Sequence, residues 1–253
     1  MSEQNMQEEE KGLFCYTFEG HIILCEWNYR SRQIIEKLRR NYRTRKTPIV
    51  LIANIDKKPI DYGNLFFVKG SVNDETLQQA NVKKAKTVII LGDDNLDDVN
   101  RDTKVALSTL TVETINRSAY TIVELVNENY VEICNRAHAD EIIVSSNLSS
   151  QLIVDSIIND GISNVIFNLL SKQYDNQLYK IPVPEDEVNR LFIDVFARMK
   201  EHRQSIVIAI QQGEGGDVIT NPSSNYTLRD DDYLIMIFNY NKYYFSALKT
   251  SNK

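Results

Sequence analysis

The sequence of 253 residues has little cysteine and histidine and no long apolar run. Its three cysteines are scattered without a Cys-x-x-Cys pair, which is typical of free thiols in a reducing compartment and excludes a disulfide framework. The three histidines lie far apart, so no Cys/His cluster has zinc spacing. No apolar stretch approaches the roughly 18–20 residues that span a bilayer. We therefore expect any membrane role to come through a partner or a preceding segment.

An excess of positive charge is also missing. The chain holds 29 Lys and Arg against 35 Asp and Glu, a net charge of −6. Neutralising phosphate groups requires a basic face, so this balance argues against nucleic acid as the main partner. The exception is the basic run Arg39, Arg40, Arg43, Arg45 and Lys46. It indicates either a solvated helix end with its loop or a contact with phosphates or anionic lipid head groups.

Short apolar runs alternate with helical patterns from Gly20 onward. Most runs are continuous in Ile, Val and Leu, which is typical of parallel strands covered on both faces. The predicted strands are 21–25, 49–53, 65–68, 87–91, 121–125 and 141–144, and the predicted helices between them are 31–41, 74–82, 96–117 and 130–137. We therefore predict an α/β fold with a Rossmann-like, doubly wound parallel sheet.

The alternation of predicted strands and helices ends after Ser145. Residues 148–159 and 162–171 read as two helices around Gly161, and their many apolar side chains favour a crossover that pairs two copies. A smaller α+β subdomain follows, with strands at 178–183, 205–211, 217–220 and 233–238 and a helix at 190–200. We expect a flexible leader at 1–19, which is neither a signal nor a transit peptide, a Rossmann-like lobe at 20–146, crossover helices for dimerisation at 147–172, a linker at 173–177 and a C-terminal subdomain at 178–253.

The first turn of such a sheet usually carries the glycines of a G-x-G-x-x-G motif, which let the backbone approach a pyrophosphate at a helix N-terminus. Here the stretch reads Cys25-Glu26-Trp27-Asn28-Tyr29-Arg30, with a glutamate in the phosphate position. Arg30 and Arg32 could offset part of that charge. Asn54 stands where an acidic residue would bind ribose. The motif therefore gives weak support for NAD binding.

A nucleotide could still enter the crevice at the carboxyl ends of the strands. Trp27 and Tyr29 could stack on a base and Asn54 could bind ribose, whereas Trp27 could equally be a core residue. The crevice either binds a ligand or is a structural remnant of the fold. The candidate ligand-binding residues are Glu26, Trp27, Asn28, Tyr29, Asn54, Ile55, Gly70, Ser71, Gly92 and Asp93.

Several motifs occur in the order of a known family. They are Gly20-His21-Ile22-Ile23-Leu24-Cys25-Glu26-Trp27-Asn28, Leu77-x-x-Ala80-x-Val82-x-x-Ala85-x-x-Val88, Ala137-x-Ala139-Asp140-x-Ile142-Ile143, Asp160-Gly161, Ile181-Pro182-Val183-Pro184-Glu185 and Asn221-Pro222…Tyr226-x-Leu228-x-x-Asp231-Asp232-x-Leu234. The ordered set covers about residues 20–238. It resembles the regulator of potassium conductance (RCK) domain, with its TrkA-N and TrkA-C parts, of prokaryotic potassium channels.

The resemblance implies a ligand-sensing gating-ring module rather than an enzyme. Family members pair through the crossover helices and assemble into rings, here expected to be octameric, on the cytoplasmic side of a potassium channel or transporter. No pore segment is present in the sequence, which leaves three options: an excised fragment, an internally initiated product or a separate subunit. Two alternatives stay open: a regulatory subunit of a Trk/Ktr-type transporter, and an NAD-dependent oxidoreductase on the same fold.

Calcium-gated relatives carry carboxylates near the ends of the third and fifth strands, because hard cations require several converging oxygens. The resemblance places Ser71, Glu124 and Val126 at these positions, so Glu124 is the one remaining candidate metal ligand. Other acids could build a different site or serve as solubilising charge and helix caps. These are Asp93, Asp94, Asp97 and Asp98. The sensed ligand, a nucleotide or a divalent cation, stays unidentified.

Overall fold

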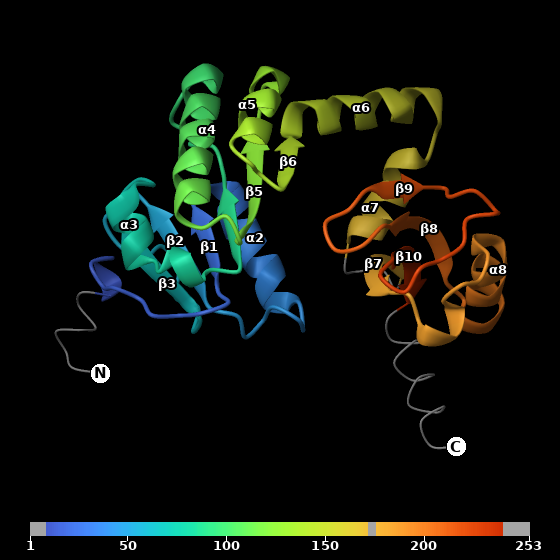
Figure 1. Ribbon diagram of the computed structural model, residues 1–253. Coiled ribbons are helices and arrows are strands. Elements are labelled where there is room, and N and C mark those ends of the chain that lie inside the picture. Colours follow the sequence, from blue (N-terminus) through green and yellow to red (C-terminus); the bar gives the residue numbers. More distant parts are fainter. Residues whose placement is uncertain (1–8, 172–175, 240–253) are drawn as a thin grey trace. The chain divides into compact units, whose positions relative to one another are not determined.

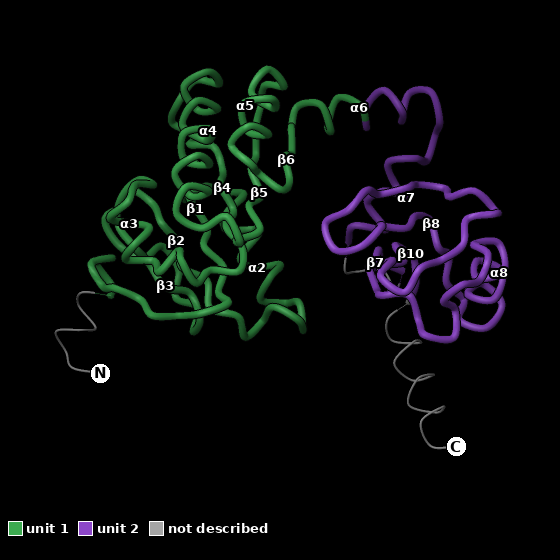
Figure 2. The backbone as a smooth tube through the Cα atoms, in the orientation of Figure 1, with its two compact units in different colours: residues 1–151 green, residues 152–253 purple. Residues whose placement is uncertain are grey.

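The computed structural model describes residues 9–171 and 176–239. The chain divides into two compact units, residues 1–151 and 152–253 (Figure 2). Most of the predicted linker at 173–177 lies outside the described residues, as do the ends of the predicted leader and of the C-terminal subdomain. Each unit is described by itself below.

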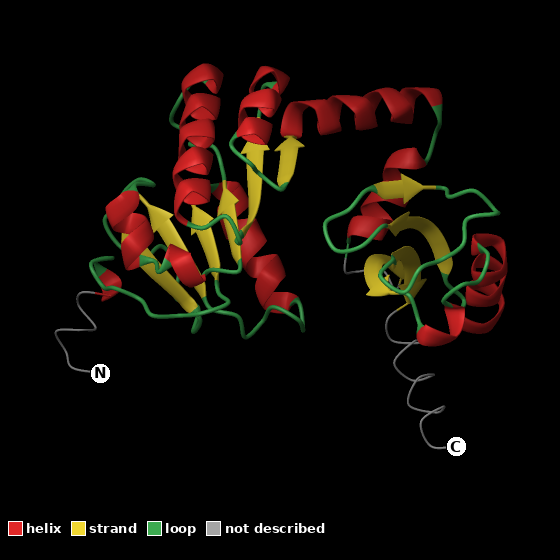
Figure 3. Ribbon diagram, viewed as in Figure 1, coloured by secondary structure: helices red, strands yellow, loops and turns green. Residues whose placement is uncertain are grey.

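The first unit is built around a six-stranded parallel sheet (Figures 1 and 3). Its strands are β1 (Ile22–Cys25), β2 (Ile49–Ala53), β3 (Leu65–Lys69), β4 (Thr87–Ile90), β5 (Tyr120–Leu125) and β6 (Glu141–Val144). Their spatial order is β3-β2-β1-β4-β5-β6, and every neighbouring pair is parallel. The order reverses between β1 and β4, which is the switch point where such folds bind ligands. The predicted Rossmann-like, doubly wound fold is confirmed.

Helices cover both faces of this sheet. Alternate strand residues belong to two separate core clusters, because successive side chains of a strand point to opposite faces. Helix α2 (Tyr29–Arg40) packs Ile35 into one cluster. Helices α3 (Asp74–Gln79), α4 (Asp98–Ile115) and α5 (Val131–Arg136) cover the other. Helices α2, α3 and α4 each begin at a polar side chain that accepts a hydrogen bond from the backbone of the first turn.

The segment ahead of β1 packs against the sheet, in contrast to the flexible leader predicted for residues 1–19. Tyr16 is only 5 % exposed, and its hydroxyl donates a hydrogen bond to the backbone oxygen of Phe67 at 3.1 Å. The rings of Phe14 and Phe18 flank it, with centroids 5.2 and 5.6 Å away. The backbone amide of Lys69 donates to the oxygen of Gly12. The prediction is therefore wrong for residues 12–18, because three alternating aromatic rings gain more from burial than they lose in chain freedom.

The second unit holds an antiparallel sheet with a helix packed against it. Strands β7 (Asn176–Pro182), β8 (Ile206–Gln211), β9 (Val218–Thr220) and β10 (Tyr233–Asn239) lie in the order β7-β10-β8-β9. Helix α8 (Phe192–Arg203) buries Phe192, Val195 and Met199 against them. The predicted smaller α+β subdomain is confirmed.

Two helices follow β6, α6 (Ser145–Ile158) and α7 (Ile162–Leu170). Gly161 precedes α7 with a φ of 91°, a left-handed conformation that glycine adopts without strain. Neither helix has a buried residue. The exposed apolar side chains are Leu148, Ile153, Val154, Ile157, Ile158, Ile162, Val165, Ile166, Phe167 and Leu170.

Replacing Tyr16 tests the packing of the first segment. We expect Tyr16→Ala to lower the free energy of unfolding of the first unit by about 3–5 kcal/mol, because a large buried ring is lost. Tyr16→Phe removes only the hydroxyl and its bonds, and should cost about 1 kcal/mol. Urea unfolding followed by the fluorescence of Trp27, the single tryptophan, reports on this unit.

Tyr42→Ala is the matched control, since Tyr42 is 47 % exposed. We expect it to change the unfolding free energy by less than about 0.5 kcal/mol. Equal effects of Tyr16→Ala and Tyr42→Ala would show that the first segment contributes no packing.

Candidate functional site: a charged crevice at the carboxyl edge of the parallel sheet

Glu26 occupies the turn directly after β1. Its φ is 76°, a left-handed conformation that is uncommon for residues other than glycine. The turn therefore keeps a backbone shape that glycine often provides, but it adds a carboxylate. That carboxylate is mostly buried and forms an ion pair with Lys104 at 2.5 Å. Burial raises the pKa of Glu26, and Lys104 opposes that shift.

Asn28 caps α2 and ties it to the turn after β4. Its Oδ1 accepts from the amide of Ser31 at 3.0 Å, and the hydroxyl of Ser31 accepts from the amide of Asn28 at 2.7 Å. Two amides at this helix start thus already have partners within the chain. The side-chain amide of Asn28 also donates to the oxygen of Gly92 at 2.9 Å. These contacts occupy groups that a phosphate would need.

Two arginines and two carboxylates form a quartet across the switch point. Arg30, at the start of α2, bonds Glu124 at 2.8 Å and Asp94 at 2.5 Å. Arg101, in the first turn of α4, reaches the same oxygens at 3.3 and 3.4 Å. Because Glu124 and Arg101 are buried, breaking this quartet would leave charges without partners, which is costly.

Lys104 joins a second, smaller group of charges. Its ammonium lies 2.5 Å from Glu26 and 2.9 Å from Asp93. Burial alone would lower the pKa of Lys104, but the hydrogen bonds to Glu26 and Asp93 raise it. Burial also opposes ionisation of Asp93, yet bonds from Lys104 and Asn95 keep its pKa below the usual value. Across both groups four carboxylates face three cations, so the crevice carries a negative excess.

Gly92 lets Arg101 pass close to the backbone. A Cβ at position 92 would lie 1.8 Å from the Nε of Arg101, well inside any contact distance. The oxygen of Gly92 also accepts from Asn28 and, at 3.4 Å, from Arg30. The glycine is therefore required by the ion pairs rather than by a bound phosphate.

The ten predicted ligand-binding residues do not all lie in one place in the structure. Glu26, Asn28, Gly92 and Asp93 meet in the crevice through the contacts above. Ser71 lines a cavity of 390 Å³ beside α4, together with Asn100, Thr103 and Lys104. Gly70 donates its amide to the oxygen of Ala53 at 3.0 Å.

The two aromatic candidates lie in different surroundings. Trp27 is partly buried and packs with Ile55 against the core beneath α2, which agrees with the core interpretation that the sequence left open. Tyr29 and Asn54 are exposed, and the hydroxyl of Tyr29 accepts a hydrogen bond from Gln33. Base stacking by Trp27 and Tyr29 stays a prediction.

Glu124 is the residue predicted to bind a metal. Its Oε2 already accepts hydrogen bonds from Arg30 and Arg101. Within residues 9–171 and 176–239, no group of three or more His, Cys, Asp or Glu side chains is arranged to hold a metal ion. A cation at Glu124 would therefore compete with two guanidinium groups.

Comparison with known proteins agrees with this architecture. Residues 17–123 match the family described as the calcium-activated potassium channel slowpoke-like RCK domain. The matched stretch is less than half of the chain, and it resembles the RCK family. The chain is 27 % identical over 245 residues to the calcium-gated potassium channel TvoK of Thermoplasma volcanium, covering 95 % of this chain and 68 % of the channel. It is 25 % identical over 225 residues to the putative potassium channel protein YugO of Bacillus subtilis, covering 88 % of this chain and 67 % of YugO.

A solved structure has a similar fold over most of the chain. A human SLO3 gating ring superposes with a TM-score of 0.71 at 15 % identity, over 90 % of this chain and 46 % of that chain. The chain thus spans about two thirds of the two channels it matches and less than half of the SLO3 chain. No helix in the described ranges is long and apolar enough to cross a membrane.

Sequence reasoning missed the charged side of α4. Arg101 and Lys104 enter the crevice, and the buried carboxylate of Asp102 accepts from the amides of Val126 and Asn127. The positions of these residues along the helix did indicate which way they face. Arg101 and Asp102 stand four and three residues before Val105, which was predicted to point inward, so they share its face.

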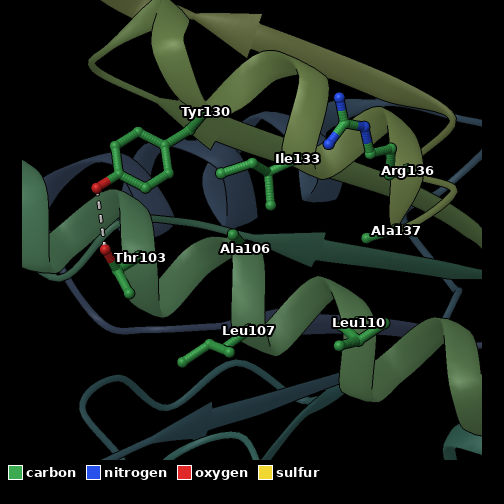
Figure 4. Close-up of a pocket in the computed structure, with 8 residues that line it drawn as sticks. All are labelled: Thr103, Ala106, Leu107, Leu110, Tyr130, Ile133, Arg136 and Ala137. Carbon is green, nitrogen blue, oxygen red and sulfur yellow. Dashed lines mark hydrogen bonds between the residues drawn. The ribbon is translucent and has the colours of Figure 1, made fainter.

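An apolar groove runs between α4 and α5 (Figure 4). It has a volume of 310 Å³, and Figure 4 shows the hydroxyl of Thr103 facing that of Tyr130, 3.0 Å away. Leu107 is 62 % exposed, and Leu110 and Ile133 are also exposed. The lining residues are Thr103, Ala106, Leu107, Leu110, Tyr130, Ile133, Arg136 and Ala137.

Gly92→Ala tests the close approach of Arg101. We expect it to destabilise the first unit by about 1–3 kcal/mol, because the added methyl group forces Arg101 out of its ion pairs. Gly63→Ala is the matched control, since a Cβ at position 63 meets nothing within 4 Å. Urea unfolding followed at Trp27 measures both variants. If the two unfold alike, the crevice has more room than the contacts indicate.

Proposed function

We propose that this chain is the cytoplasmic ligand-sensing module of a potassium channel and forms part of a gating ring at the inner face of the membrane. The observation that carries the proposal is the extent of the match to a calcium-gated potassium channel, which covers 95 % of the chain and therefore both units. The fold shared with a human SLO3 gating ring supports it.

A regulatory role is favoured over nicotinamide-dependent catalysis. The turn that would hold a pyrophosphate presents the carboxylate of Glu26, and nearby amides at the start of α2 are used by Asn28 and Ser31. The crevice has a negative excess, which opposes an anionic dinucleotide. The chain therefore has the sheet of a dehydrogenase without the phosphate-binding turn, and a fold alone does not set a function.

The crossover helices at 147–172 are proposed to pair with the same helices of a second copy. In α6 and α7, Ile157 is 79 % exposed and Phe167 is 60 % exposed. Exposed apolar side chains in such number usually mark an interface, because leaving them in water is costly. A two-fold pair would place identical faces together.

A ring of eight copies requires a second surface. A two-fold contact uses the same patch on both partners, so it stops at the dimer. The groove between α4 and α5 supplies a separate exposed apolar patch, with Leu107, Leu110 and Ile133 at its rim. We assign this groove to the contact between dimers, occupied by another copy of the chain.

Helix α4 connects the crevice to that groove. Arg101 and Lys104 form ion pairs near its start, and Leu107 and Leu110 line the groove one to two turns further along. A ligand that changes the ion pairs at the predicted crevice residues thereby acts on the helix that carries the ring contact. It shifts the ring between two arrangements by its differential affinity, typically ~1–3 kcal/mol per coupled site.

Introducing charged residues tests the two proposed interfaces separately. We expect Ile157→Glu with Phe167→Glu to prevent pairing through the crossover helices, because a buried unpaired carboxylate is costly. Leu107→Glu with Leu110→Glu should leave dimers and remove larger rings. Ile193→Glu with Val218→Glu, also at exposed apolar positions, is the control and should assemble like the wild type. Light scattering and sedimentation velocity measure the mass. A wild-type monomer at micromolar concentration would contradict both interfaces.

A chimaera tests the regulatory role. This chain would replace the matching segment of the Thermoplasma volcanium channel, and potassium flux into vesicles would be measured with calcium, magnesium, adenine nucleotides and NAD as probes. We expect at least one probe to change the flux, and Glu124→Gln to weaken that response because the quartet loses a charge.

Asp56→Asn serves as the control for that variant, because the Asp56 side chain is fully exposed beside Lys69. An assembled chimaera whose flux ignores every probe would refute the sensing role. Turnover of NADH by the isolated chain would favour an enzyme instead.

A further inference from the structure

The end of α2 and the turn after it carry an unusual density of positive charge. Residues 37–46 contain six Lys or Arg and no Asp or Glu, in a chain whose net charge is −6. We call this segment the basic turn. Five of the six cations are exposed, and none of these five forms an ion pair with a described carboxylate: Lys37, Arg40, Arg43, Arg45 and Lys46. Some cations elsewhere in the first unit, such as Arg32 and Lys69, do have acidic partners.

Arg39 fixes the shape of the basic turn. Its guanidinium donates to the backbone oxygens of Arg45 at 3.2 Å, Thr47 at 2.8 Å and Asn64 at 2.6 Å. The hydroxyl of Thr44 donates to the oxygen of Leu38 at 2.7 Å. The sixth cation thus holds the backbone while the other five are exposed, so the charged surface is pre-organised.

Helix stabilisation explains only part of this charge. Cations in the last turn of a helix interact favourably with its dipole, which accounts for Lys37 and Arg40. Arg43, Arg45 and Lys46 follow after α2 has ended at Arg40. Their charge brings mutual repulsion without a partner in the first unit, so a partner of opposite charge would relieve it.

Tyr42 lies among these cations and indicates the kind of partner. It is 47 % exposed, and the guanidinium of Arg43 lies 5.6 Å from the centre of its ring. Tyrosine with neighbouring Lys and Arg is typical of segments at the interface of a bilayer, where the ring sits among head groups and the cations meet their phosphates. A nucleic-acid site would instead extend its cations along a groove that follows the phosphate backbone.

We propose that the basic turn docks on the surface of an anionic phospholipid bilayer. Exposed Lys and Arg supply the attraction, and Tyr42 enters the head-group layer. At physiological salt, charges further apart than about 8 Å are largely screened, so distant acidic surface opposes this contact only weakly. The proposal concerns a surface outside the crevice and both apolar interfaces. The vesicle experiment therefore tests the membrane contact alone. Its result does not depend on whether the chimaera responds to ligands.

Vesicle co-sedimentation tests the proposal. The chain would be mixed with vesicles of phosphatidylcholine alone or of phosphatidylcholine with phosphatidylserine. We expect binding only to the anionic vesicles, weakening as salt rises. The variant Arg43→Gln/Arg45→Gln/Lys46→Gln should lower the partition coefficient about 100-fold, since each charge near an anionic surface is worth about fivefold.

The matched control neutralises three exposed lysines elsewhere, Lys57→Gln/Lys83→Gln/Lys86→Gln, with the same change in net charge. It should bind like the wild type, and both variants should keep the thermal midpoint because all six side chains are exposed. Equal binding to neutral vesicles, or an equal loss in both variants, would overturn the proposal. Release of the chain from anionic vesicles by millimolar inorganic phosphate would also overturn it. So would binding to a DNA duplex that is tighter than binding to vesicles and is abolished in the Arg43→Gln/Arg45→Gln/Lys46→Gln variant.

Discussion

The charge quartet of Arg30, Asp94, Arg101 and Glu124 is the constraint on which the first unit depends. It joins α2, the turn after β4, the start of α4 and the end of β5 at the point where the strand order reverses. An open crevice at this point would usually be closed by a bound ligand. Here the chain's own side chains close it, so the two layers of helices are tied together through paired charges, of which Arg101 and Glu124 are buried.

Most of the fold could be predicted because its signals are local. The continuous apolar strands and the polar helix caps each occupy a few neighbouring residues, and the observed strands match the predicted ranges within a few positions. The packing of Tyr16 could not be predicted in this way. Its partner is Phe67, 51 residues away, and the alternation of Phe14, Tyr16 and Phe18 was hidden within a polar terminus.

The site was harder to predict than the fold, for the same reason. Glu26 and Gly92 were identified because a sheet of this type brings strand ends together, but the identity of their partners depends on which side of α4 faces inward. Arg101 and Lys104 look like ordinary surface charges in a long helix. Only the three-dimensional contacts show that these two cations neutralise half of the charge that Glu26, Asp93, Asp94 and Glu124 bring.

The attachment of the first segment to the sheet has a mechanical consequence. Backbone and aromatic contacts hold residues 12–18 along β3 and the core beneath α3, so little slack separates Gly12 from the sheet. A force applied at Gly12 would act directly on the edge of the sheet, because no flexible segment between them has to be extended first. The unit can therefore pass tension in either direction through Gly12, with Tyr16 acting as the anchor.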